Sequence, residues 1–97
     1  MRIIAKKTLK EFWDLHKDAE QPLRSWYDIV RKENWINFNE IKSQFRNASI
    51  VGNDRVVFNI KGNSYRLVVR IDFNWKVMYI RFIGTHNEYD KLNVNKL

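Results

Sequence analysis

The chain has 97 residues, a length that predicts a single domain spanning residues 1–97. Hydrophobic residues make up 44% of the sequence and aromatic residues 14%, which is enough for a packed core and argues against disorder. Cysteine is absent, which excludes a disulfide framework and a cysteine-based zinc site. No apolar run approaches the roughly 20 residues of a membrane helix, and no signal peptide is recognisable, so we expect a cytoplasmic protein.

The net charge of +7 comes from 18 lysine and arginine residues against 11 aspartate and glutamate residues. A basic surplus on so small a protein favours a polyanionic or acidic partner, which includes RNA, DNA, an acidic protein or an anionic membrane. The surplus is concentrated between Arg55 and Arg81, a segment in which Asp72 is the only acid. This segment is therefore the first candidate for a functional surface.

The N-terminal half is typical of a short strand followed by a helical hairpin. Residues 1–5 are expected to form the strand, and apolar residues recur at helical spacing over residues 9–16 and 23–30. Thr8 and Asp18 stand at the first position of capping-box spacings, so we expect the two helices to begin near them.

The C-terminal half changes from helical periodicity to strand periodicity. After a weaker helical turn over residues 39–45, apolar and polar residues alternate over residues 55–60, 65–73 and 77–83. Turn-forming residues separate these runs, which predicts an antiparallel meander with one apolar face for the helices to cover. Residues 84–91 are expected to close the domain as a loop or short helix.

Strand alternation divides the side chains of the meander between two faces. The last strand is expected to turn Met78, Ile80 and Phe82 toward the helices. The opposite face of the sheet then gathers the polar and basic side chains Asn59, Lys61, Arg66, Arg70, Tyr79 and Arg81. Such a face suits a phosphate backbone, with an aromatic ring available for base stacking worth about 1–3 kcal/mol. The alternative is an ordinary solvated sheet face, although such a face usually mixes charge signs.

The segment after the last strand is rich in side chains that can exchange protons. His86, Tyr89 and Lys91 lie within it, and histidine titrates nearest to neutral pH. A lone histidine is more often structural than catalytic, and Thr85 with Glu88 also has capping-box spacing. Both interpretations of His86 therefore remain open on the residues alone.

Other chemistries find little support in the sequence. It has no phosphate-binding glycine loop, and no carboxylate-rich set accompanies His16 and His86, so neither a metal nor an organic cofactor is expected. His16 completes an apolar helix stripe and is interpreted as structural. Of the four tryptophans, Trp75 lies in a predicted turn and is the one expected to be exposed.

Two blocks of the C-terminal half resemble the HigB family of type II toxins. They read NDRVVFNIKGNSYRLVV at residues 53–69 and YIRFIGTHNEYDK at residues 79–91. The N-terminal MRIIA and the AEQPL of residues 19–23 fit the same family, so the resemblance covers nearly the whole chain. It implies an α+β fold of the RelE/ParE type, in which a short N-terminal strand and a helical hairpin pack on an antiparallel meander.

The resemblance also implies a function and partners. The chain would be the toxin of a type II toxin–antitoxin system, a ribosome-dependent mRNA endoribonuclease that inhibits translation and growth. Its partners would be mRNA, the ribosome and a HigA-like antitoxin with a helix-turn-helix domain. The toxin would contact operator DNA only through this antitoxin. Two alternatives remain: a ParE-like toxin that inhibits gyrase, and an RNA-binding module without catalysis.

The reaction implied by the resemblance is attack of a ribose 2′-hydroxyl on the adjacent phosphodiester. Arg66 and Arg81 are the candidates for holding the phosphate, because guanidinium binds phosphate bidentately and stays charged. Lys61 would add electrostatic stabilisation, and His86 and Tyr89 are the acid–base candidates in either order. Residues expected to hold RNA without doing chemistry are Arg55, Asn59, Arg70, Tyr79 and Lys91.

Overall fold

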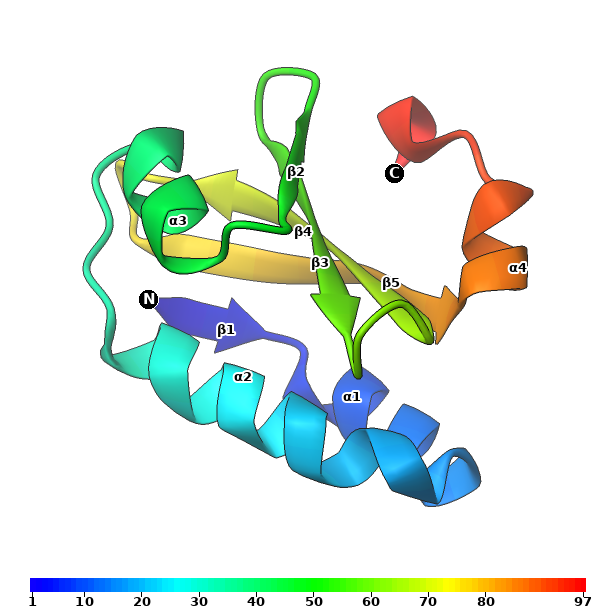
Figure 1. Cartoon of the computed structure of the whole chain (residues 1–97). Coiled ribbons are helices and arrows are strands. Elements are labelled where there is room, and N and C mark those ends of the chain that lie inside the picture. Colours follow the sequence, from blue (N-terminus) through cyan, green and yellow to red (C-terminus); the bar gives the residue numbers. More distant parts are fainter.

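A computed structural model describes residues 1–97, apart from the side chain of Asn95. Its centre is a five-stranded sheet with the strand order β1-β5-β4-β3-β2 (Figure 1). The strands are β1 (Arg2–Ile4), β2 (Ser49–Val51), β3 (Arg55–Ile60), β4 (Tyr65–Asp72) and β5 (Val77–Thr85). Strand β1 pairs parallel to β5, and the other neighbours pair antiparallel. The expected α+β class, the N-terminal strand and the antiparallel meander are confirmed, and β2 is an additional strand at one edge of the sheet.

The helices lie mainly on one side of this sheet. They are α1 (Lys6–Leu15), the 3-10 helix η1 (Lys17–Ala19), α2 (Glu20–Lys32), α3 (Phe38–Gln44), α4 (His86–Asp90) and the 3-10 helix η2 (Val94–Lys96). Figure 1 shows α1 and α2 running beneath the sheet, whereas α4 follows the end of β5. Within the described part of the chain, no helix has the length and apolar character needed to span a membrane.

The two long helices begin within two residues of the predicted positions Thr8 and Asp18, but the predicted side-chain caps do not form. Helix α1 begins directly after Ala5, and the amide of Thr8 already donates to the Ala5 carbonyl at 3.1 Å. Helix α2 begins after Ala19, and no side chain caps it. The carboxylate of Asp18 turns instead toward the β3–β4 turn, where two distant side chains bind it. At Asp18, tertiary partners have therefore replaced the local capping bond that the spacing predicted.

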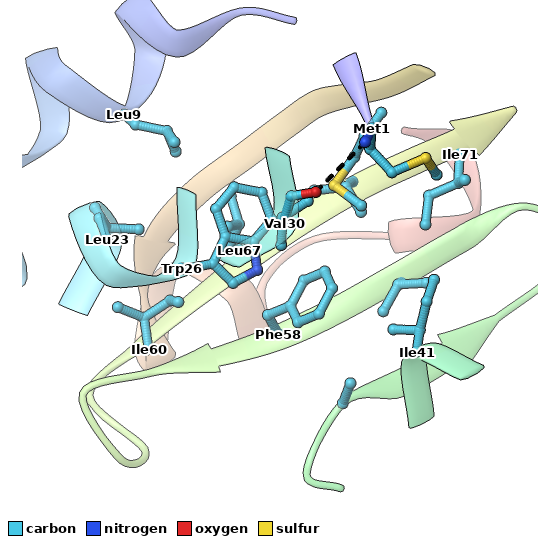
Figure 2. Packing of buried hydrophobic residues seen from close by; sticks show 14 of the residues in the cluster. Met1, Leu9, Leu23, Trp26, Val30, Ile41, Phe58, Ile60, Leu67 and Ile71 are labelled. Atoms are coloured by element: carbon cyan, nitrogen blue, oxygen red, sulfur yellow. Dashed lines mark hydrogen bonds between the residues drawn. The ribbon is translucent and has the colours of Figure 1, made fainter. Parts of the chain in front are cut away.

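The core lies between the helices and the apolar face of the sheet. Figure 2 shows Trp26 and Val30 of α2, with Ile41 of α3, gathered around Phe58 of β3. The rings of Trp26 and Phe58 meet edge to face with their centroids 5.4 Å apart. Burying each side chain of this size contributes about 1.5–3 kcal/mol. On the core side of the sheet, alternation correctly predicted the buried residues of the first two meander strands, which are Val56, Phe58, Ile60, Tyr65, Leu67, Val69 and Ile71.

A β-bulge interrupts the pairing of β4 with β5. Val68 pairs with Phe82, whereas the next residue, Val69, pairs with Ile80. Arg81 is therefore an extra residue on β5, without a partner in this register. An extra residue shifts the period-two alternation of the strand by one position.

The bulge reverses the orientation of the end of β5. Met78 and Ile80 face the helices as predicted, but beyond the bulge Ile83 packs against the core. Phe82 lies on the opposite side of the sheet, so the prediction that it faces the helices is wrong. The alternation of apolar residues in β5 could not reveal this, because both Phe82 and Ile83 are apolar.

Candidate functional site

The outer face is the name we give to the side of β3, β4 and β5 that is turned away from α1 and α2. Its residues follow from the strand register: Arg55, Val57 and Asn59 of β3, Arg66, Val68 and Arg70 of β4, and Tyr79 and Phe82 of β5. Asn59 lies opposite Arg66, and Arg70 lies between Arg55 and Tyr79. The predicted placement of Asn59, Arg66, Arg70 and Tyr79 on one face is confirmed. Val57 and Val68 are buried, so the middle of this face is apolar rather than basic.

Two arginines at one end of the outer face share a carboxylate. Arg55 and Arg70 are directly paired across β3 and β4, an arrangement of like charges that is destabilising by itself. Asp54 lies between them: its Oδ1 accepts from Arg55 Nη1 at 3.0 Å, and its Oδ2 forms an ion pair with Arg70, 3.1 Å from Nε. Asp54 stands one residue before the basic segment that begins at Arg55, and its carboxylate partly neutralises the face.

Tyr79 links the two arginines on its own side of the sheet. The guanidinium carbons of Arg70 and Arg81 lie 5.5 Å and 5.7 Å from the centroid of the Tyr79 ring. Both distances are within the range of a cation–π interaction. Arg81 is exposed at the bulge, a feature that commonly re-aims a side chain. Two guanidinium groups and a phenol ring thus stand together on the outer face.

Lys61 does not lie on the outer face, and its predicted placement there is wrong. It has a positive φ of 51° in the β3–β4 turn, which ends the alternation of the strand. Its ammonium group donates to Asp18 Oδ2 of η1 at 2.6 Å. Lys61 therefore points toward the helical hairpin.

Two other predicted catalytic residues, Arg66 and His86, form hydrogen bonds to the β3–β4 turn. Arg66 reaches back and donates from Nη1 to the Asn63 carbonyl at 3.0 Å. The backbone amide of His86 donates to the Ser64 carbonyl at 3.1 Å. Arg66 and His86, which are far apart in sequence, are thereby brought to the same turn.

Helix α4 carries the proton-exchanging residues of the C-terminal segment. His86 Nδ1 lies 3.0 Å from Asp90 Oδ2, with both side chains about half exposed. The capping box of Thr85 and Glu88 is confirmed, and hydrogen bonds from the Thr85 backbone and side chain hold the pKa of Glu88 below its usual value. Tyr89 is partly buried, and the predicted RNA-binding residue that follows α4, Lys91, is exposed.

Asp18 and Tyr65 form a contact that the sequence did not indicate. The Tyr65 hydroxyl donates to the same carboxylate that binds Lys61. The hydrogen bond from Lys61, followed by that from Tyr65, lowers the pKa of Asp18, and the bond to Asp18 raises the pKa of Tyr65. His16 stacks on Phe12 with ring centroids 4.3 Å apart, which agrees with its interpretation as a packing residue.

No cluster of three histidine, aspartate or glutamate side chains that could hold a metal ion occurs among the described residues. The groups that the site offers are guanidinium, imidazole, phenol and carboxylate. Such groups can bind phosphate and exchange protons.

Comparison with known proteins assigns the chain to a family. A model of the HigB toxin, described as the RelE-like toxic component of a toxin–antitoxin system, matches residues 19–92. The chain belongs to the HigB toxin family. It is 28% identical over 94 residues to the mRNA interferase HigB of Escherichia coli O6:H1 (strain CFT073), covering 95% of this chain and 91% of that protein. It is 27% identical over 92 residues to the mRNA interferase toxin HigB of Escherichia coli (strain K12), covering 93% of this chain and 88% of that protein.

As a HigB toxin, the chain has an antitoxin as its natural partner. All of the predicted site residues lie within the range that the family model matches. Asp18, which binds Lys61 and Tyr65, stands one position before that range.

Proposed function

We propose that this HigB toxin is an endoribonuclease that cleaves mRNA on translating ribosomes in the cytoplasm and thereby stops growth. The names of its relatives, mRNA interferases, support the reaction class. The observation that carries the proposal is that the Arg66 side chain and the His86 backbone amide both donate to carbonyls of the β3–β4 turn, which supports a role for both residues in one site. The proposed antidote is a HigA-like helix-turn-helix protein, and the toxin would contact operator DNA only through it.

The proposed reaction needs only the RNA and the side chains of the toxin, without a metal ion. The ribose 2′-oxygen forms a bond to phosphorus while the bond from phosphorus to the 5′-oxygen breaks, which leaves a 2′,3′-cyclic phosphate and a 5′-hydroxyl. Arg66 and Arg81 hold the non-bridging oxygens, where charge builds up in the transition state. Lys61 adds positive potential, reduced by its ion pair with Asp18.

Proton transfer is assigned to His86 and Tyr89. One of them accepts the proton of the 2′-hydroxyl, and the other donates a proton to the leaving 5′-oxygen. Asp90 engages Nδ1 of His86, so Nε2 is the nitrogen that exchanges the proton. The RNA strand would lie along Arg55, Asn59, Arg70, Tyr79 and Lys91.

Primer extension on mRNA from cells that express the toxin tests this proposal. We expect new 5′ ends inside translated codons, and none on the same mRNA when its start codon is removed. Both rival functions, inhibition of gyrase and RNA binding without catalysis, predict no new ends. A complete lack of translation-dependent ends would therefore refute the nuclease.

Arg81→Ala provides the inactive variant for the same assay. We expect it to abolish the cleavage and the growth arrest, because it removes one of the two phosphate clamps. Its melting curve should be unchanged, since an exposed arginine usually contributes within about 0.5 kcal/mol to stability. Arg31→Ala, which removes an exposed arginine of α2, is the matched control and should cleave as the wild type does. Full toxicity of a normally folded Arg81→Ala protein would exclude Arg81 from the site.

A further inference from the structure

Asp54 forms ion pairs with two arginines, Arg55 and Arg70. It lies in the turn between β2 and β3, and its own backbone carbonyl accepts from the Ile71 amide of β4 at 2.8 Å. One carboxylate oxygen binds Arg55 Nη1 at 3.0 Å, and the other binds Arg70 Nε at 3.1 Å. A hydrogen bond to β4 thus holds the backbone of Asp54, and two guanidinium groups hold its carboxylate.

The contact with Asp54 leaves part of Arg70 available to a ligand. An arginine has five N–H donors in a planar fork, and the Asp54 carboxylate forms an ion pair on the Nε side of that fork, with Oδ2 3.1 Å from Nε. The Arg70 guanidinium also lies over the Tyr79 ring, which Arg81 approaches as well. A connected row of contacts therefore runs from Asp54 through Arg70 and Tyr79 to Arg81, across the outer face.

We infer that Asp54 is a positioning residue of the RNA-cleaving site, and that it acts by holding the Arg70 guanidinium in a set orientation against Tyr79. This inference rests on the proposed function. Arginine is a long, flexible side chain, and fixing it before RNA arrives removes an ordering cost from binding and catalysis. Asp54 itself does not contact the RNA and works through Arg70.

A purely electrostatic role for Asp54 makes the opposite prediction. If the carboxylate only relieved repulsion between Arg55 and Arg70, its removal would add one positive charge to the face. Binding of RNA would then become tighter and cleavage would be maintained. Positioning predicts that cleavage falls although the net positive charge has risen.

The test compares Asp54→Asn with Asp72→Asn. Asp72 occupies the same side of β4 two residues beyond Arg70, and its carboxylate accepts from the Trp75 amide at 3.1 Å. Both changes remove one negative charge from the same side of the sheet. In single-turnover cleavage of ribosome-bound mRNA, Asp54→Asn should raise the half-saturating toxin concentration and lower the cleavage rate at sub-saturating toxin about tenfold or more. Asp72→Asn should leave the rate unchanged, and equal rates for the two variants would overturn the inference.

A double variant shows whether Asp54 acts through Arg70. Arg70→Ala alone should slow cleavage, and adding Asp54→Asn to it should have no further effect. An additional loss of the same size as in the single variant would place the action of Asp54 elsewhere.

Nuclear magnetic resonance gives a readout that does not depend on cleavage. The Nε signal of Arg70 should have the same chemical shift in the wild type and in Asp72→Asn, and should move toward that of a free arginine in Asp54→Asn. An unchanged Arg70 signal in Asp54→Asn would overturn the inference. A wild-type toxin that fails to cleave would instead refute the proposed nuclease, while this comparison would still decide whether Asp54 holds Arg70.

Discussion

Single side chains on the outer face owe their orientation to specific neighbours. Arg66 is turned toward the Asn63 carbonyl, and Arg70 is held between Asp54 and Tyr79. An unrestrained arginine samples many rotamers, so these contacts decide in which direction each guanidinium points. The chemistry of the face therefore depends on residues that do not themselves bind phosphate.

Gly84 is the residue whose size is most tightly restricted at the end of β5. An added Cβ would lie 2.4 Å from Cζ of Phe82 and 3.0 Å from a carboxylate oxygen of Glu88. Phe82 is placed over Gly84 because the bulge turns it to the outer face. We expect Gly84→Ala to lower the free energy of unfolding by about 1–3 kcal/mol, the usual effect of overpacking, as measured by urea denaturation.

A second substitution identifies the cause of that loss. In a Phe82→Leu background the ring is gone, so adding Gly84→Ala should cost much less than it does in the wild type. An equal cost in both backgrounds would show that the Phe82 contact is not the reason for glycine.

At the scale of elements, the β3–β4 turn is attached to the helical hairpin through Asp18. Lys61 and Tyr65 flank this turn, and both donate to the Asp18 carboxylate. The Lys61 bond is the largest cause of the lowered pKa of Asp18. A folded-state pKa below the unfolded one means that the charged form stabilises the fold, and that this stabilisation is lost as the pH falls through the folded-state pKa.

Asp18→Asn should remove this pH-dependent part of the stability. Above the unfolded-state pKa of about 3.9 the wild type has the full contribution of Asp18, and it loses that contribution on acidification below this value. The free energy of unfolding of Asp18→Asn should be lower at neutral pH and should decline less between neutral and acid conditions. Urea denaturation over a series of pH values measures both effects.

Asp28→Asn is the matched control for the pH series. Asp28 pairs with Arg31 on the exposed side of α2 at 3.3 Å, and such surface pairs contribute little to stability. Its curve should follow the wild type. Parallel curves for Asp18→Asn and the wild type would contradict a stabilising role for the Asp18 contacts.

At the scale of the whole molecule, the net charge of +7 is unevenly distributed. The helices α1 and α2 carry ion pairs within themselves, such as Lys7 with Glu11 and Arg24 with Glu20, so much of their charge cancels locally. The basic residues of β4 and β5 have fewer acids nearby in sequence, and they lie on the side of the sheet away from these helices. The asymmetry favours approach of RNA to the outer face.

Salt dependence of RNA binding tests this asymmetry. Each phosphate contact to single-stranded RNA adds about 0.7 to the slope of log affinity against log salt concentration. Arg66→Ala should therefore reduce that slope by about this amount, as measured by fluorescence anisotropy with a single-stranded oligonucleotide. Lys7→Ala, on an exposed side of α1, should leave the slope unchanged. Equal slopes for Arg66→Ala and the wild type would mean that Arg66 makes no phosphate contact.

The sequence predicted those features that depend on neighbours a few positions away. Helical and strand periodicity located the main elements, the spacing of Thr85 and Glu88 revealed a capping box that forms, and turn chemistry marked Trp75 as exposed. The same local rules failed for Thr8 and Asp18, because capping spacing is only one of the uses open to such residues.

What the sequence determined by itself is the α+β class, the placement of Asn59 and Arg66 on the same face of the sheet and, through its resemblance, the HigB family. Only the tertiary structure decided that β5 bulges at Arg81, that Lys61 turns to Asp18, and that Asp54 binds Arg70. The physical reason is that periodicity reports which side of an element is apolar. It does not report the register between two strands, nor which partner a charged side chain finds tens of residues away.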